Sequence, residues 1–293
     1  VVTTAAGRGV VPADHPLHLG TTATEGVADA LADRDLALAV GSALSPRDVE
    51  DLGLPEALIH VGLDRANLDR THPATVGIVA DATETVEALD DRVRREGGAD
   101  GPTGRSPAPL WPSAEHDHRH RILAALREGL DDDAILVNDM TKVSYAALGA
   151  FPSYTPRSFQ FPRGFGTLGF SPPAAYGAGL ALPDRQVAAV VGDGGFMFTV
   201  QDLATAVKYE IGVPVVLVND ESYEVVRDAM VESYGRSTGT DIANPEFVAL
   251  AESFGAATER VDVEAVETEL PAALAGAVDR DRPTGIEVPV GDR

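Results

Sequence analysis

The chain has 293 residues and no cysteine, so disulfide bonds and cysteine-ligated metal sites are excluded, while the length allows two domains. Its 46 acidic residues outnumber its 23 basic residues, and the formal net charge of −23 argues against a nucleic acid partner, because phosphate contacts need a basic surface. No apolar run reaches the roughly eighteen residues of a membrane span, so we expect a cytoplasmic protein with no membrane partner.

The first part of the chain, residues 1–96, is predicted to be an α/β domain. Three apolar segments are the predicted strands, at 35–40, 58–62 and 75–80. A helix is expected over 83–95. The segment 97–112 is rich in Gly and Pro and has no apolar period, which indicates a linker.

The second predicted domain is residues 113–293. Its alternating strands and helices predict an open, mostly parallel sheet that is covered on both faces, with ligand groups at the carboxyl ends of the strands. The strands are expected at 134–137, 186–191, 213–218 and 285–290. Asn244 is predicted to cap a helix with Pro245 at its first position. The aromatic and Pro-rich segment 151–162 is predicted to lack regular structure.

The segment from Gly192 to Tyr223 carries the clearest functional pattern. It is predicted to form a glycine turn, a helix capped by Thr199, a buried strand and a second, acidic turn. A helical crossover between parallel strands returns the chain to the same edge of the sheet. Asp193 and Asp220 can therefore face each other although they are 27 positions apart.

These two turns suit a divalent cation that carries a phosphate. A hard cation such as Mg²⁺ takes oxygen ligands, which Asp193, Asp220 and the carbonyl of Ser222 can supply. The N–H groups of Gly194 and Gly195 would point at an anion. Taken alone, a GDGG turn is commonly no more than a corner between a strand and a helix, and the second acidic turn is what favours the cation site.

The pattern resembles a known family. GDG, followed by a helix, a strand and Asn-Asp, is similar to the thiamine-diphosphate-binding signature of the pyruvate decarboxylase and acetolactate synthase superfamily. The resemblance continues in GTLGFSPPAAYGA at 166–178 and in Asp139-Met140-Thr141-Lys142. It implies two doubly wound, mostly parallel α/β domains: a Rossmann-like middle domain, incomplete at its start, and a thiamine-diphosphate-binding domain.

The resemblance also implies roles for individual residues. Leu168 would prop the cofactor in a bent conformation, and Asp193, Asp220 and Ser222 would hold Mg²⁺. The other implied cofactor contacts are Thr141, Lys142, Gly166, Gly192, Gly194, Gly195, Phe196 and Tyr223. For Lys142 a plain surface position remains the alternative. Asp220 replaces the commoner Asn of the family, and its extra charge should favour the cation and disfavour the diphosphate.

The implied reaction is decarboxylation or carboligation of a 2-oxo acid, so the implied enzyme is a lyase or a transferase. In this reaction the thiazolium ring of the cofactor stores the electrons released when CO₂ leaves. FAD is not expected, because the family's flavin-holding segments are replaced by Thr21-Thr22-Ala23 and by residues 42–46. Segment 224–236, with Arg227 and Glu232, is predicted to frame the substrate mouth. A 5-guanidino-2-oxopentanoate-type decarboxylase is the specific alternative, and a non-catalytic, cofactor-holding fragment is the other.

No stretch matches the family's pyrimidine-binding domain, which carries the glutamate that activates the cofactor. The resemblance implies that this half of the site comes from a second subunit, in a homodimer or tetramer when the enzyme is complete. We therefore expect the isolated chain to be inactive.

The acidic composition, in which Lys142 and Lys208 are the only lysines, predicts a halophilic protein; an acidic mesophilic enzyme is the alternative. Salt screens repulsion between like charges, with a Debye length of about 3 Å at 1 M. The melting temperature, followed by circular dichroism, should therefore rise between about 0.1 M and about 3 M KCl. A melting temperature that stays constant over this range would contradict the prediction.

Overall fold

The computed structural model describes residues 1–96, 117–278 and 280–291, and these residues fall into two compact units. The smaller unit contains residues 1–5 and those from 14 to 96. The larger unit contains residues 6–13 and the described residues from 117 onwards. The predicted linker at 97–112 lies outside the described residues.

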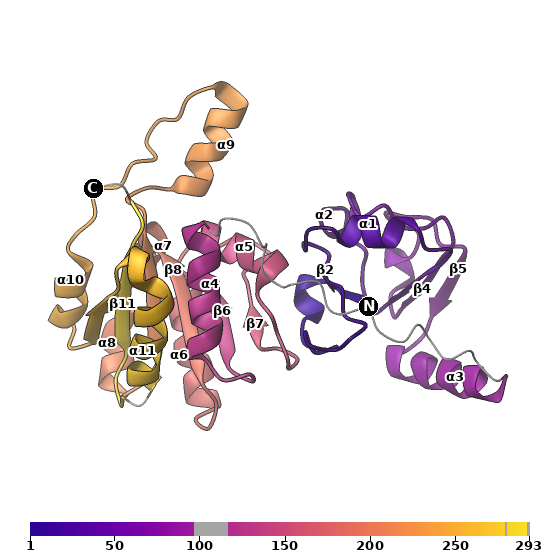
Figure 1. The fold of residues 1–293 in the computed structure, drawn as a ribbon, viewed down its shortest axis with the longest axis horizontal. Helices are drawn as coiled ribbons and strands as arrows, with labels where there is room; N and C mark the ends of the chain where they lie inside the picture. The colour runs from indigo at the N-terminus through magenta and orange to yellow at the C-terminus, as the bar shows by residue number, and fades with distance from the viewer. Residues whose placement is uncertain (97–116, 279, 292–293) are drawn as a thin grey trace. The chain divides into compact units, whose positions relative to one another are not determined.

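The larger unit is built on a six-stranded sheet in the order β10-β11-β9-β8-β6-β7, and every pair of neighbouring strands is parallel (Figure 1). This arrangement confirms the predicted α/β fold with a parallel sheet. The strands are β6 (Ile135–Asn138), β7 (Phe159–Gln160), β8 (Val187–Gly192), β9 (Pro214–Asn219), β10 (Ala257–Arg260) and β11 (Thr284–Pro289).

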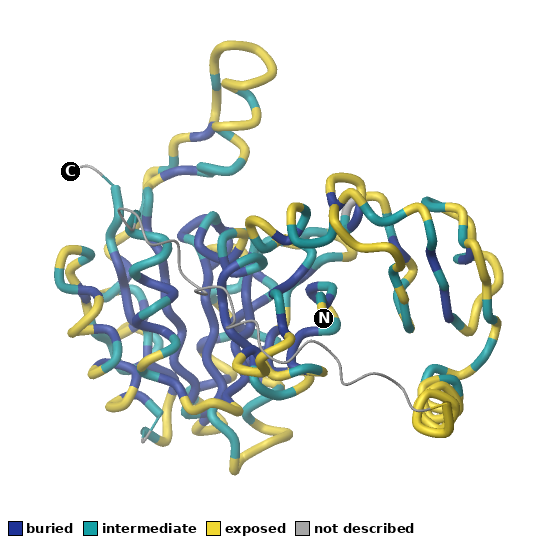
Figure 2. Tube along the Cα trace, turned by 45° about the vertical axis from the view of Figure 1, so that its right-hand side comes forward, coloured by how far each residue is buried: buried dark blue, intermediate teal, exposed yellow. Residues whose placement is uncertain are grey.

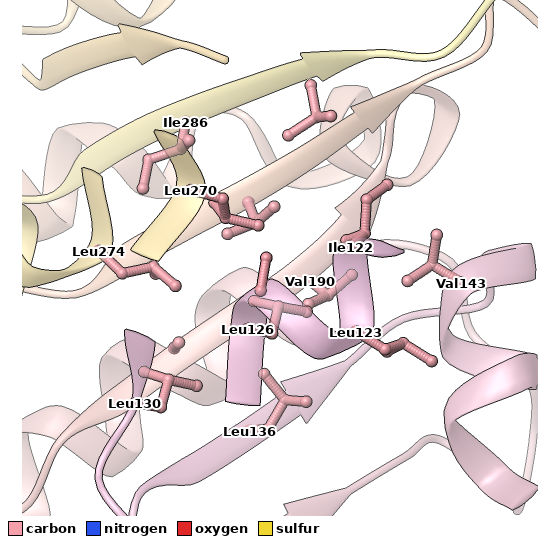
Figure 3. Packing of buried hydrophobic residues seen from close by; sticks show 14 of the residues in the cluster. Ile122, Leu123, Leu126, Leu130, Leu136, Val143, Val190, Leu270, Leu274 and Ile286 are labelled. Atoms are coloured by element: carbon pink, nitrogen blue, oxygen red, sulfur yellow. The ribbon is translucent and has the colours of Figure 1, made fainter. Parts of the chain in front are cut away.

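Helices cover both faces of this sheet. One face carries α4 (His118–Gly129), α5 (Lys142–Ala150) and α11 (Val266–Val278), and the other carries α6 (Ser171–Ala181), α8 (Asp202–Lys208) and α10 (Phe247–Ser253). Successive strand residues alternate between the two faces, so Val190 packs with Leu126 and Leu270 while Ala189 packs in the opposite core (Figure 3). Burial on both faces explains why the strands read as unbroken apolar runs.

Three local predictions were wrong. β7 lies inside the segment 151–162, where no regular structure was expected, because Phe159 pairs with Leu136 at the edge of the sheet. Helix α7 (Asp193–Thr199) begins directly at the glycine turn, so Thr199 ends this helix and does not cap the next one. Asn244 does not cap α10, whose N-cap is Glu246, because the Asn244 amide is bound elsewhere.

The smaller unit has a three-stranded parallel sheet in the order β3-β4-β5 and a short parallel pair, β1-β2. Its strands are β1 (Val2–Thr3), β2 (Gly20–Thr21), β3 (Ala37–Val40), β4 (Leu58–Gly62) and β5 (Val76–Val79), and its α-helices are α1 (Val27–Ala32), α2 (Pro46–Val49) and α3 (Ala82–Arg95). Its core is small, and α3 has no buried residue (Figure 2). Across the described part of the chain, no helix has the length and apolar character needed to cross a membrane.

Residues 6–13 leave the smaller unit and pack on the larger one. The Arg8 guanidinium is 3% exposed, donates to the carbonyl of Phe151 at 2.8 Å and lies 4.2 Å from the ring centre of Phe159. Burial lowers the pKa of Arg8 to about 9. Gly9 has φ +74°, and a Cβ there would lie 2.0 Å from the Thr155 carbonyl oxygen, so the segment fits against its neighbour only with glycine at this position.

Candidate active site at the carboxyl edge of the larger sheet

The candidate site is placed by the parallel pairing of β6, β8 and β9. Asn138 pairs with Val190, and Gly192 pairs with Val218, so the residues that follow these three strands meet at one edge of the sheet. After β6 the chain first adds β7 on one side and then β8 on the other. Such a reversal of strand order opens a crevice at the carboxyl ends of the strands, where ligands bind in α/β proteins.

The structure brings the two predicted carboxylates, Asp193 and Asp220, together at this edge. Asp193 is 2% exposed, and burial raises its pKa. The pKa of Asp220 is raised to about 7, first by burial, then by the negative charge of Asp193 and by a hydrogen bond with Glu224. The two carboxyl groups therefore place more negative charge at this edge than the surrounding protein groups stabilise.

Main-chain and side-chain hydrogen-bond donors hold these carboxylates. Asp193 Oδ1 accepts from the Gly194 N–H at 2.7 Å, and its Oδ2 accepts from the Asn244 side-chain amide at 2.6 Å. Asp220 Oδ1 accepts from the Ser222 N–H at 3.0 Å, across a turn in which Glu221 has φ +58°. Asn244 was not among the predicted site residues, since its sequence neighbourhood indicated only a helix start.

Tyr223 closes the second turn against the first. Its N–H donates to the Thr240 carbonyl at 2.7 Å, and Ser222 forms an antiparallel bridge with Asp241. A Cβ on Gly194 would lie 2.4 Å from Tyr223 Cε1, so the Tyr223 ring lies directly against the glycine turn. Any side chain at position 194 would collide with the Tyr223 ring, so this position requires glycine.

Asp139, at the end of β6, fixes the loop that carries Leu168. This carboxylate is 1% exposed, and it accepts from the N–H groups of Gly169 at 3.1 Å and Ser171 at 2.9 Å. Leu168 is half-buried immediately before Gly169. Gly166, also predicted to touch the cofactor, has φ +66°, a left-handed conformation that favours glycine. Asp139 thus positions the loop that contains Leu168.

The two residues after Asp139-Met140 lie at the same edge but already have protein partners. Thr141 caps α5 by accepting from the Val143 N–H at 3.2 Å, and a Cβ on Gly192 would lie 3.7 Å from the Thr141 side chain. Lys142 Nζ lies 2.7 Å from a Glu224 carboxylate oxygen and 2.5 Å from one of Asp228. Lys142 is therefore ion-paired at this edge, and its predicted contact with the cofactor stays a prediction.

Phe196, another predicted cofactor contact, packs its side chain in the core. It is 4% exposed and meets Phe247 edge-to-face, with ring centres 5.8 Å apart. Any contact between Phe196 and a ligand at the strand ends would have to come from its main chain.

The donor set fits a hard divalent cation. Among the described residues, no group of three or more His, Cys, Asp or Glu is placed to bind a metal, so a cation at Asp193 and Asp220 would complete its shell with main-chain and ligand oxygens. That combination is typical of Mg²⁺ with a phosphate-bearing ligand. A divalent cation would also neutralise the charge that raises the pKa of Asp220.

The raised pKa of Asp220 gives a pH dependence with a defined sign. A carboxyl group whose pKa is higher in the folded state stabilises that state below its unfolded pKa of about 4, and this contribution is lost as pH rises through about 7. In EDTA, Asp220→Asn should therefore raise the melting temperature at about pH 8 and have little effect at about pH 4.5. Thermal unfolding of both proteins across this range measures the difference. A constant difference would contradict the assigned pKa.

Comparison with known proteins places both units in one family. Residues 139–288 match the profile of the thiamine pyrophosphate enzyme C-terminal TPP binding domain, and residues 1–89 match the profile of the central domain. The chain is 35% identical to a probable 2-ketoarginine decarboxylase of Pseudomonas aeruginosa, covering 92% of this chain and 50% of that protein. It is 29% identical to the large subunit of acetolactate synthase isozyme 1 of Escherichia coli, covering 96% and 52%.

A solved structure agrees with these matches. The thiamine diphosphate-dependent 4-hydroxybenzoylformate decarboxylase of Rhodococcus jostii superimposes with a TM-score of 0.78 at 29% identity, covering 99% of this chain and 56% of that one. The chain spans about half the length of the curated relatives named above. With two family profiles matched in order and the strand-end carboxylates in place, the chain belongs to the thiamine diphosphate-dependent enzymes of the acetolactate synthase and pyruvate decarboxylase superfamily.

Proposed function

We propose that the chain supplies the diphosphate- and metal-binding half of a thiamine diphosphate- and Mg²⁺-dependent enzyme that decarboxylates or ligates 2-oxo acids. The observation that carries this proposal is the pair of Asp193 and Asp220 at the ends of the adjacent strands β8 and β9, where burial and the charge of Asp193 raise the pKa of Asp220. A cation bound to both carboxylates compensates that charge and offers its remaining positions to phosphate oxygens.

The residues of the chain divide the work of binding and positioning. Asp193, Asp220 and the main chain at Ser222 hold the cation, and the cation in turn binds the diphosphate beside the glycine turn. Leu168 supports the cofactor from a loop that Asp139 fixes. When bound, thiamine diphosphate supplies an electron sink for cleavage of the bond between a carbonyl carbon and a carboxylate.

A 2-oxo acid with a cationic side chain is the second candidate substrate. Helix α9 (Glu224–Tyr234) carries Glu224, Asp228 and Glu232 at intervals of four residues, which places three carboxyl groups on one side of the helix. Lys142 and Arg227 neutralise Glu224 and Asp228, leaving Glu232 further along the same side. This acidic side and the similarity to a probable 2-ketoarginine decarboxylase favour a guanidino-bearing substrate over an acidic one.

The activating half of the site is proposed to lie in a pyrimidine-binding domain, on a second subunit of a homodimer or tetramer. The support is that the relatives named above are about twice as long as this chain. Without that domain, cofactor binding should weaken and turnover should be lost.

Cofactor binding is expected to depend on Mg²⁺ through Asp193. Calorimetric titration of thiamine diphosphate into the 293-residue chain should show binding with Mg²⁺ and none with EDTA. Asp193→Ala should weaken binding by about 100-fold or more, since it removes a direct ligand. The exposed Asp184, which lies in the loop before β8, provides the matched control, and Asp184→Ala should bind like the wild type. Equal affinity in EDTA and Mg²⁺ would refute the proposal.

Turnover is expected only when a pyrimidine-binding domain is present. CO₂ release should be measured from pyruvate, longer 2-oxo acids and the guanidino analogue, in high salt with thiamine diphosphate and Mg²⁺. The isolated chain should release none, and the chain within a full-length parent, or mixed with a pyrimidine-domain chain, should release CO₂ from at least one substrate. Sustained turnover by the isolated chain would show that the assignment of the activating half is wrong.

A further inference from the structure

The Asn244 side chain connects Asp193, at the proposed metal site, to Asn219, the last residue of β9. Its side-chain nitrogen donates to Asp193 Oδ2 at 2.6 Å, 51 positions away in the chain, and to Asn219 Oδ1 at 3.0 Å. An amide nitrogen has two hydrogens, so both are used on these two acceptors. If the Asn244 amide were flipped, its oxygen would face Asp193 Oδ2 and Asn219 Oδ1, neither of which can donate a hydrogen bond. These two acceptors therefore fix the orientation of the amide.

Asn219 is oriented in the same way by Glu287. Its side-chain nitrogen donates to Glu287 Oε1 at 2.8 Å, and its oxygen accepts from Asn244 and, at 3.3 Å, from the Glu221 N–H. Because the Glu287 oxygen accepts, Asn219 has to present its nitrogen to Glu287 and its oxygen to Asn244. Each group in the series therefore dictates the direction of the next.

The far end of this series is anchored in the core. Glu287, on β11, is 4% exposed and lines a small apolar cavity together with Phe196, Leu217 and Phe247. The Arg260 Nε lies 3.6 Å from its second carboxyl oxygen. Hydrogen bonds in such surroundings meet little competition from water, so they hold their partners firmly.

We propose that Glu287, Asn219 and Asn244 form an amide relay that positions the Asp193 carboxylate for the cation. Asn244 occupies one oxygen of Asp193 from outside the glycine turn, while the Gly194 N–H binds the other. The carboxylate is thereby held in one orientation before a cation arrives. None of the three relay residues has to touch the cation, so they are positioning residues. The inference rests on the proposed metal site.

The relay can be tested with Mn²⁺, which prefers the same oxygen ligands as Mg²⁺ and is detected by electron paramagnetic resonance. Asn244→Leu removes both donors at similar volume, and Glu287→Leu removes the anchor. Both should weaken Mn²⁺ binding to the whole chain by about 10- to 100-fold. Glu287→Gln keeps an accepting oxygen for Asn219 and should remain within about 3-fold of the wild type.

Ser253→Ala is the matched control, because it removes a hydrogen bond of 2.6 Å within α10 that has no connection to the relay. Titrations are made well below the melting temperature of each variant. If Asn244→Leu does not fold, the Gln and Leu variants at Glu287 still decide the outcome. Wild-type affinity in both Leu variants would overturn the relay and leave the metal site standing. Failure of the wild type to bind Mn²⁺ would overturn both.

Discussion

Two carboxyl groups at the ends of adjacent parallel strands repel each other where little water can screen them, and the surrounding site is arranged to contain that repulsion. Asp193 and Asp220 are brought together by the register of β8 and β9, and both have raised pKa values. The turns around them present donors: main-chain N–H groups from Gly194 and Ser222 and an amide from Asn244. These donors orient the oxygens without neutralising their charge, and the proposed divalent cation would supply the missing positive charge.

Acidic residues also determine how α9 is held against the rest of the larger unit. This helix has no buried residue, so apolar packing contributes little to its position. Lys142 instead bridges Glu224 and Asp228, and Glu224 also lies beside Asp220. The helix that follows the turn of Asp220 is therefore held by ion pairs to α5, the helix that follows β6. Glu224, the first residue of α9, interacts with both Lys142 and Asp220. A change of charge at Asp220 can therefore affect the position of α9 through the Glu224 side chain.

The sequence predicted those parts of the site that depend on strand ends. The runs that became β8 and β9 were visible as apolar segments, and parallel pairing then required Asp193 and Asp220 to meet. Asn244 could not be found in this way, because it lies in a loop with no periodic pattern and reaches Asp193 only through the tertiary fold. The partners of Lys142 were equally hidden, since residues on α5 and α9 are far apart in the chain.

Residues 6–13 belong to the larger unit although they precede most of the smaller unit in the chain. A boundary drawn by sequence alone separates residues 1–96 from residues 113–293, yet Arg8 belongs to the core of the larger unit. A fragment that begins at residue 113 would lose this guanidinium from the Phe159 ring and leave the Phe151 carbonyl without its donor. The larger unit is therefore discontinuous in sequence, because it includes eight residues near the start of the polypeptide. A fragment designed to contain only the larger unit must include these residues or replace their contacts.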